Sequence, residues 1–236
     1  MTMKIAVCFS GQPRSLESAY PYYKKNLFDP NPDAQIDVFC HSWEGVSLDN
    51  IYSLYKPKKG LISPSLPSSL DKKYTKTPNP ERHPPRFTVS AFFSIFQSNL
   101  LRIQHEQENS KYDWVIRTRY DYALNAEIPF HKLSQDKLYV PNCRISPQRD
   151  FCNDQFAIGS SHIMTAYSST YLWLEQFYSR GTEMIGENML SENLKMYGLV
   201  GDNLVYMDMK NPFPPGPYNG TSHSLIRDDM EKWKQS

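Results

Sequence analysis

The sequence has no strong excess of charge of either sign. Its 26 Lys and Arg residues nearly balance its 25 Asp and Glu residues, which gives a formal net charge of +1. Non-specific binding to nucleic acid needs a basic surplus, so we expect no nucleic-acid partner. There is also no apolar run of about 18 residues, and we expect no transmembrane segment. The stretch Met1–Ser10 is too short and too weakly charged to predict a signal peptide.

The sequence has few cysteines, and they are widely spaced. The four cysteines are Cys8, Cys40, Cys143 and Cys152, and no two of them form a C-x-x-C pair. This pattern argues against a disulfide scaffold and against a zinc-finger site. Cys8 and Cys40 lie in apolar runs, which is typical of buried thiols. The cysteine usage therefore favours a reducing, cytoplasmic location.

Several well-known motifs are missing as well. The sequence contains neither G-x-x-x-x-G-K-[ST] nor G-x-G-x-x-G, which argues against a P-loop NTPase and a dinucleotide-binding enzyme. It also lacks G-x-S-x-G, the nucleophile motif of α/β-hydrolases, and the zinc motif H-E-x-x-H. Any chemistry must therefore be sought in residues outside these motifs.

The first 40 residues predict a βαβ unit. The apolar run Lys4–Phe9 and the run Ile36–Cys40 are typical of buried strands. Between them we expect a helix that is capped by Ser15 and runs toward Phe28, with Pro21 as a kink or an early end. A strand, a helix and a strand at this spacing predict two parallel strands in an α/β sheet.

The rest of the chain continues this alternation. A helix is expected from Thr88, as its cap, to about Asn109. Six apolar residues at helical spacing are expected to pack it into the core: Val89, Phe92, Phe93, Phe96, Leu100 and Ile103. Further strands are expected over 112–118, 138–140, 155–158 and 204–207, and further helices from Ser160 or Ser161 to Tyr178 and over 187–197.

The predicted fold is a single α/β domain over residues 1–236, with a central mixed, mostly parallel sheet flanked by helices. A C-terminal tail over 208–236 is expected to hold a proline-rich loop and a short helix. Residues 56–86 contain seven prolines, eight Lys or Arg residues and two acids. We expect this segment to be irregular, either as a solvated insertion or as a basic flap beside an anionic ligand.

Polar residues follow three of the predicted strands. Ligands of open α/β sheets bind beyond the carboxyl ends of the strands, so these residues are expected to meet in one cleft. Guanidinium groups and turn N–H groups suit a phosphate or a diphosphate. For each arginine alone, a surface ion pair is the structural alternative. The candidate nucleotide-binding residues are Ser10, Gly11, Gln12, Arg14, His41, Trp43, Arg117 and Arg119.

Two acidic residues are candidates for chemistry at the same edge. Asp121 follows the strand over 112–118, where one carboxylate can hold Mg²⁺ or Mn²⁺ together with substrate phosphates. Asp154 precedes a predicted strand and is a candidate general base that acts on a hydroxyl. A turn or capping role is the alternative for Asp154. Trp43, Tyr120 and Tyr122 are candidates for stacking or for plain packing.

Four segments in this order, KIAVCFSGQPRSL, DVFCHSW, YDWVIRTRYDYAL and NDQFAIGSS, resemble a family of small GT-A-type glycosyltransferases. Such enzymes occur in bacterial surface-polysaccharide clusters and in large DNA viruses and phages. The resemblance spans roughly residues 4–204. It implies a GT-A-like fold, a nucleoside diphosphate sugar as donor and a carbohydrate acceptor, in the cytoplasm of a bacterium or of a virus-infected cell.

The resemblance also implies residue roles. The turn from Ser10 to Arg14 would line the nucleotide or diphosphate, and Asp154 would lie near the acceptor hydroxyl. Asp121 would stand at the last acid of the D-x-D metal motif, but position 119 is Arg. Either Asp121 holds Mn²⁺ or Mg²⁺, or Arg117 and Arg119 neutralise the leaving diphosphate without a metal.

Two other functions remain open at this point. The single acid of the degenerate motif is compatible with a non-catalytic domain that binds a nucleotide sugar or a glycan. A phosphotransferase or sulfotransferase would use the same arginines, although the sequence lacks the glycine- and lysine-containing turn of a P-loop.

Overall fold

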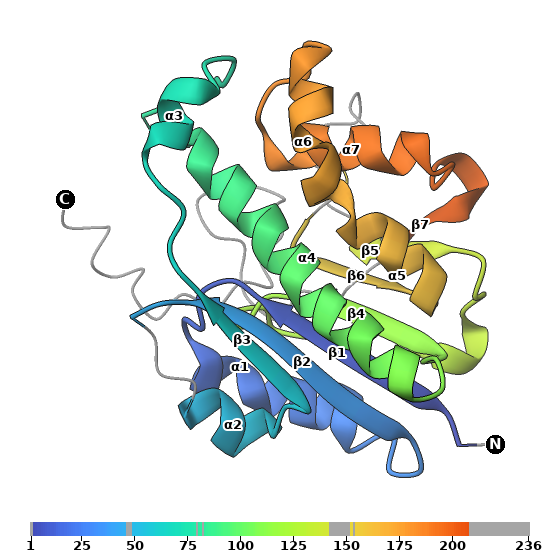
Figure 1. Cartoon of the computed structure of the whole chain (residues 1–236). Helices are drawn as coiled ribbons and strands as arrows, with labels where there is room; N and C mark the ends of the chain where they lie inside the picture. The colour runs from blue at the N-terminus through green and yellow to red at the C-terminus, as the bar shows by residue number, and fades with distance from the viewer. Residues whose placement is uncertain are drawn as a thin grey trace.

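The computed structural model describes residues 2–45, 49–78, 80–81, 83–141, 152 and 154–207. It confirms an α/β fold with one seven-stranded, mixed and mostly parallel sheet that is flanked by helices (Figure 1). The strands are β1 Lys4–Ser10, β2 Gln35–Trp43, β3 Lys59–Ser63, β4 Trp114–Thr118, β5 Leu138–Pro141, β6 Phe156–Gly159 and β7 Leu204–Met207. The α-helices are α1 Leu16–Tyr23, α2 Asp49–Tyr55, α3 Ser69–Lys73, α4 Pro85–Glu108, α5 Ser161–Ser168, α6 Thr170–Ser179 and α7 Gly186–Met196.

The order of the strands in space is β3-β2-β1-β4-β6-β5-β7. Strands β1 to β4 are parallel, β6 runs antiparallel to both β4 and β5, and β7 is parallel to β5. The chain therefore builds outward from β1 to β3, crosses the sheet through α4 and continues on the other side of β1. In open α/β sheets, such a reversal between β1 and β4 is the place where ligands bind.

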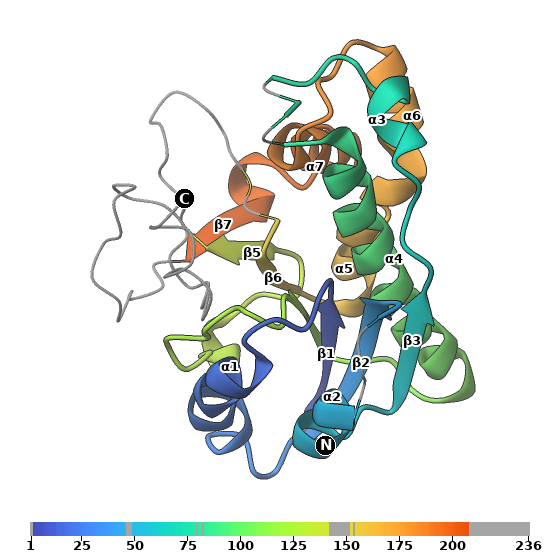
Figure 2. The same ribbon diagram turned by 90° about the vertical axis from the view of Figure 1, so that its left-hand side faces the viewer.

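A hydrophobic layer covers each face of the sheet. Helices α4 to α7 lie on one face, and α1 and α2 lie on the other (Figure 2). Side chains along β1 alternate between the two layers: Ile5, Val7 and Phe9 face α1, whereas Ala6 and Cys8 face α4. Continuous burial of a strand on both faces explains its uninterrupted apolar run.

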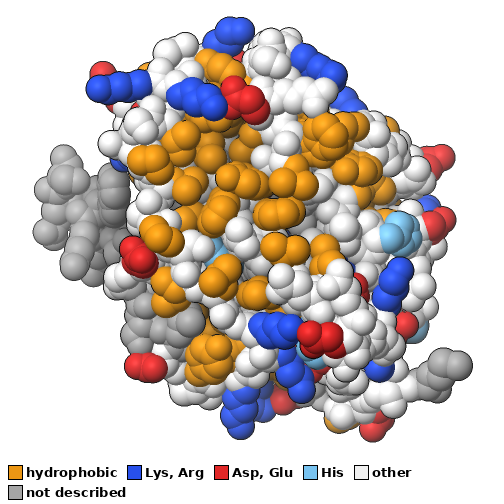
Figure 3. All heavy atoms as spheres, in the orientation of Figure 1, with side chains coloured by type: hydrophobic (Ala, Val, Ile, Leu, Met, Phe, Trp, Pro, Cys, Tyr) orange, Lys and Arg blue, Asp and Glu red, His pale blue; other side chains and the backbone are white. Residues whose placement is uncertain are grey.

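Helix α4 differs from the sequence-based expectation. It begins at Pro85, so Thr88 lies in the first turn and does not cap the helix. Proline suits the first helical position because the N–H it lacks has no partner there. Val89 and Phe92 are buried as expected, whereas the other four residues of the predicted apolar stripe are only partly buried. Figure 3 shows hydrophobic side chains gathered over the face on which α4 lies.

The inner side of α4 explains this difference, because it carries polar residues. Four polar residues of α4 have buried side chains: Ser94, Ser98, Asn99 and Arg102. Buried polar groups need hydrogen-bond partners, and Ser94 and Arg102 have theirs outside the helix, in the Gly11 turn and in α5. These partners favour the side of α4 that faces the sheet. Phe93 and Phe96 then pack against Tyr171 of α6 on the outer side of the helix.

The segment over 56–86 is more regular than expected. It contains β3, helix α3 and the first two residues of α4. Strand β3 is an edge strand whose five residues are all partly exposed, and it pairs with the far end of β2. This pairing also extends β2 to Trp43, three residues beyond the predicted strand. Asp71 in α3 forms an ion pair with Arg86 at the start of α4.

The expected later strands are confirmed within one or two residues. Pro21 lies inside α1, which passes into a π-helical turn over Lys24–Phe28. The expected helix from Ser160 or Ser161 is divided at Ser169 into α5 and α6. The expected tail over 208–236 lies outside the described residues.

Cys8, Cys40 and Cys152 are buried free thiols, which confirms the expectation for Cys8 and Cys40. Cys143 lies outside the described residues. Within the described part of the chain, no helix combines the length and the apolar character that a membrane span requires.

Candidate functional site

The carboxyl ends of β1, β2 and β4 lie side by side at the reversal point of the sheet. Ser10 is opposite His41 of β2, and Phe9 is opposite Thr118 of β4. The turn that follows Ser10 therefore lies between His41 and the segment that begins with Arg119. Gly11 in this turn has a φ of 105°, a conformation that favours glycine.

A chain of hydrogen bonds holds the turn. The Gly11 N–H donates to Ser94 Oγ at 2.7 Å, and Ser94 Oγ also contacts His41 Nδ1 at 2.7 Å. His41 Nε2 contacts Ser63 Oγ at 2.9 Å. Each ring nitrogen therefore meets a hydroxyl, which satisfies either neutral tautomer of the fully buried His41. Burial lowers the pKa of His41 to about 4.

The aromatic candidates pack inside the fold. Trp43 is 7% exposed, and its ring stacks on Phe93 with the centroids 5.5 Å apart. Tyr120 is fully buried, stacks on Phe9 and donates a hydrogen bond to the main-chain oxygen of His41. These contacts show how the rings pack, and a contact of Trp43 or His41 with a donor stays a prediction.

Arg117 projects from β4 beneath the candidate site. It is 3% exposed, and its Nη1 donates to the main-chain oxygen of Asp154. Burial lowers the pKa of Arg117, while the neighbouring Tyr167 and Asp154 oppose this effect. The structure thus brings two candidates together, Arg117 and Asp154, that are 37 residues apart in the sequence.

Arg119 and Asp121 form a bidentate ion pair. Arg119 Nε and Nη2 donate to the two carboxylate oxygens of Asp121, each at 2.7 Å. The Asp121 side chain is almost fully buried, whereas 35% of the Arg119 side chain is exposed. These bonds use two of the five N–H groups of the guanidinium. Asp121 therefore orients Arg119, whose remaining N–H groups suit a phosphate.

This arrangement bears on the predicted metal site. Both oxygens of Asp121 already accept hydrogen bonds from Arg119. Across the described ranges, no three His, Cys, Asp or Glu residues come together in a way that could hold a metal ion. A cation at Asp121 would have to displace Arg119 from at least one carboxylate oxygen, so the Asp121 carboxylate in this arrangement fits Mn²⁺ or Mg²⁺ poorly.

Glu187 is a partly buried acid that sequence reasoning passed over. It is the second residue of α7, and burial, followed by the charge of Asp154, raises its pKa. No local pattern predicts that Glu187 lies near Asp154, because this proximity depends on how α7 packs against the segment before β6. By contrast, Gln12 and Arg14 are exposed, and no side-chain hydrogen bond or ion pair joins either to the other candidates among the described residues.

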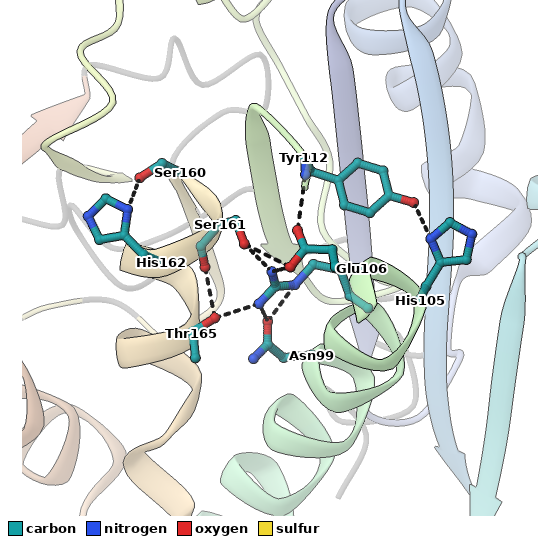
Figure 4. Close-up of polar contacts among 9 residues, drawn as sticks. Asn99, His105, Glu106, Tyr112, Ser160, Ser161, His162 and Thr165 are labelled. Carbon is teal, nitrogen blue, oxygen red and sulfur yellow. Dashed lines mark hydrogen bonds and ion pairs between the residues drawn. The ribbon is translucent and has the colours of Figure 1, made fainter. Parts of the chain in front are cut away.

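A second polar cluster lies near the amino end of β4, away from these residues (Figure 4). Arg102 is fully buried and donates from Nη1 to Glu106 at 2.7 Å and to Ser161 at 2.6 Å. Its Nε and Nη2 donate to Asn99, and Nη2 also donates to Thr165. All five N–H groups are thus paired, which identifies a structural network joining α4 to α5.

Among curated proteins, none matches the sequence. The family model described as a domain of unknown function, DUF7796, matches residues 91–215. Because this match spans more than half of the 236 residues, the chain belongs to the DUF7796 family.

Proposed function

We propose that this protein is a glycosyltransferase that moves a sugar from a nucleoside diphosphate sugar to a carbohydrate hydroxyl in glycan or polysaccharide synthesis, with the cytoplasm as its expected location. The observation that carries the proposal is the Arg119–Asp121 pair beside the Gly11 turn, at the reversal between β1 and β4. This is the ligand-binding position of open α/β sheets. The DUF7796 match includes Arg117, Arg119, Asp121 and Asp154.

In the proposed reaction, the C–O bond between the sugar and the diphosphate breaks, and negative charge builds up on the leaving diphosphate. Arg119 stabilises that charge, held in position by Asp121. The acceptor oxygen attacks the anomeric carbon, and a carboxylate takes its proton. Asp154 is the sequence-based candidate for this base. The occupation of both Asp121 oxygens by Arg119 favours charge neutralisation by arginine.

A non-catalytic domain that binds a nucleotide sugar or a glycan is the second candidate. The Arg119–Asp121 pair also favours this candidate, because Asp121 is the one acid of the degenerate D-x-D motif and both of its carboxylate oxygens bind Arg119. Both candidates predict donor binding, and only the transferase predicts turnover. Release of nucleoside diphosphate from UDP- and GDP-linked hexoses distinguishes them.

The first prediction concerns Arg119 and donor binding. A ligand that binds only the folded state raises the melting temperature, so we expect a selective rise with one of UDP, GDP, UDP-glucose, UDP-galactose or GDP-mannose. Arg119→Gln is expected to weaken this binding about tenfold or more, because a hydrogen bond between charged groups is lost. Isothermal titration measures the change, and Arg180→Gln at an exposed position is the matched control. No shift with any of these ligands would refute the proposal.

The second prediction concerns the metal. If arginine neutralises the diphosphate, donor affinity in EDTA is expected to stay within about twofold of the affinity in Mn²⁺, whereas Asp121→Asn releases Arg119 and weakens binding about threefold to tenfold. Titrations of wild type and variant under both conditions test this. Donor binding that requires Mn²⁺ in the wild type and loses that requirement in Asp121→Asn would instead make Asp121 a metal ligand.

A further inference from the structure

Two carboxylates meet where helix α7 begins. A Cβ atom placed on Gly186 would lie 3.4 Å from Asp154 Oδ2, so the Asp154 carboxylate rests against the first residue of α7. Glu187 is the next residue, and Asp154 acts on it electrostatically. Arg117 reaches the same place from β4 through its bond to the main chain of Asp154.

Two buried polar groups lie behind this pair of carboxylates. Tyr167 of α5 is fully buried and interacts electrostatically with both Arg117 and Asp154. Among the described residues, its hydroxyl has no hydrogen-bond partner, and neither has Arg117 Nε. Buried polar atoms without partners are rare in proteins, and a bound ligand is one way to satisfy them.

The surroundings of the Glu187 carboxyl favour its protonated form. Burial, followed by the negative charge of Asp154, raises the pKa of Glu187. A general base works best when its pKa approaches the working pH. Among the described residues, Asp154 is the charged group that acts on Glu187, and Arg117 and Tyr167 lie behind Asp154.

We propose that Glu187 is the general base of the transfer and that Asp154 orients the attacking hydroxyl beside it. This inference rests on the glycosyltransferase function proposed above. The hydroxyl oxygen forms a bond with the anomeric carbon, and the bond from that carbon to the diphosphate oxygen breaks. The electron pair leaves with the diphosphate, and the hydroxyl proton passes to Glu187 Oε and then to solvent. Water is the simplest acceptor for the same step.

The experiment uses the full chain, with water as acceptor. Release of nucleoside diphosphate from UDP-glucose, UDP-galactose and GDP-mannose is measured between pH 5 and 9. Glu187→Gln is expected to lower the hydrolysis rate of the accepted donor about 100-fold or more and to remove the acid limb of the pH profile, while donor affinity changes less than about twofold. The matched control is Glu192→Gln on the same helix, where Glu192 pairs with Lys195 at the surface.

A second measurement keeps the test independent of any effect of Glu187→Gln on folding. In Asp154→Asn the acid limb is expected to move to lower pH, because the charge that acts on Glu187 is gone. A purely structural role for Glu187 would leave that limb in place. Glu187→Gln with wild-type hydrolysis, or an acid limb unmoved in Asp154→Asn, would overturn the role of Glu187 while donor binding stands. A wild type that binds no donor would overturn the proposed function, and the role of Glu187 with it.

Discussion

Replacement of Arg102 by methionine is expected to lower the free energy of unfolding by about 3–5 kcal/mol. Arg102 is fully buried, and its partner Glu106 has only 8% of its side chain exposed. The variant leaves this carboxylate without its cation, and Ser161 and Thr165 each lose a hydrogen-bond donor. Loss of one partner of a buried ion pair costs far more than the net stability that the pair contributes.

Urea denaturation followed by circular dichroism measures this change. Lys195→Met is the control, because Lys195 pairs with Glu192 at the surface, where such pairs contribute about 0–1 kcal/mol. A loss below about 1 kcal/mol in Arg102→Met would contradict the structural role of the network.

Acid is expected to destabilise the protein through His41. The pKa of His41 is about 4 in the folded protein, against an ordinary value of 6.5. As the pH falls below 6.5, the unfolded chain binds a proton that the folded protein does not, so stability is lost. By pH 4 the loss reaches about 3 kcal/mol, and it levels off below that pH.

Because other groups also titrate in this range, the test compares variants. The unfolding free energy of His41→Gln is expected to fall less between pH 7.5 and pH 4 than that of the wild type, by about 3 kcal/mol. His83→Gln, at an exposed position, serves as the control. Parallel pH curves for wild type and His41→Gln would show that His41 is readily protonated in the folded protein.

The sequence predicts the central strands well but does not predict the edge strand β3. Strands β1 and β4 are buried on both faces, so that an apolar run marks each of them. Strand β3, with the sequence KGLIS, has two large apolar residues and neighbouring prolines. It is a strand because β2 offers hydrogen bonds to it, and that partner is invisible in a local pattern.

The inner side of α4 shows a second limit. Helical spacing of Phe93, Phe96 and Leu100 predicts an apolar face turned toward the core. The structure instead turns Ser94 and Arg102 inward, because Gly11 and the residues of α5 supply their hydrogen bonds. A pattern based on hydrophobicity has no means of finding partners that lie 59 or 83 residues away.

The candidate site, too, is predictable from the sequence only in part. The meeting of the ends of β1, β2 and β4 follows from parallel topology, which the sequence predicts. The pairing of Arg119 with Asp121 depends on side-chain geometry, and the approach of Glu187 to Asp154 depends on the packing of α7. Neither is encoded in the spacing of these residues.

The polar inner side of α4 restricts the helix to one rotational setting on the sheet. Ser94 and Arg102 are eight residues apart, which is about 12 Å along a helix. A rotation of α4 by one residue, about 100°, would separate Ser94 from Gly11 and, at the same time, Arg102 from Ser161 and Thr165 of α5. An apolar helix slides between similar positions at little cost, whereas α4 has one rotational setting that satisfies both ends. The turn at Gly11 is therefore aligned in part by contacts that α4 forms with α5 near the amino end of β4.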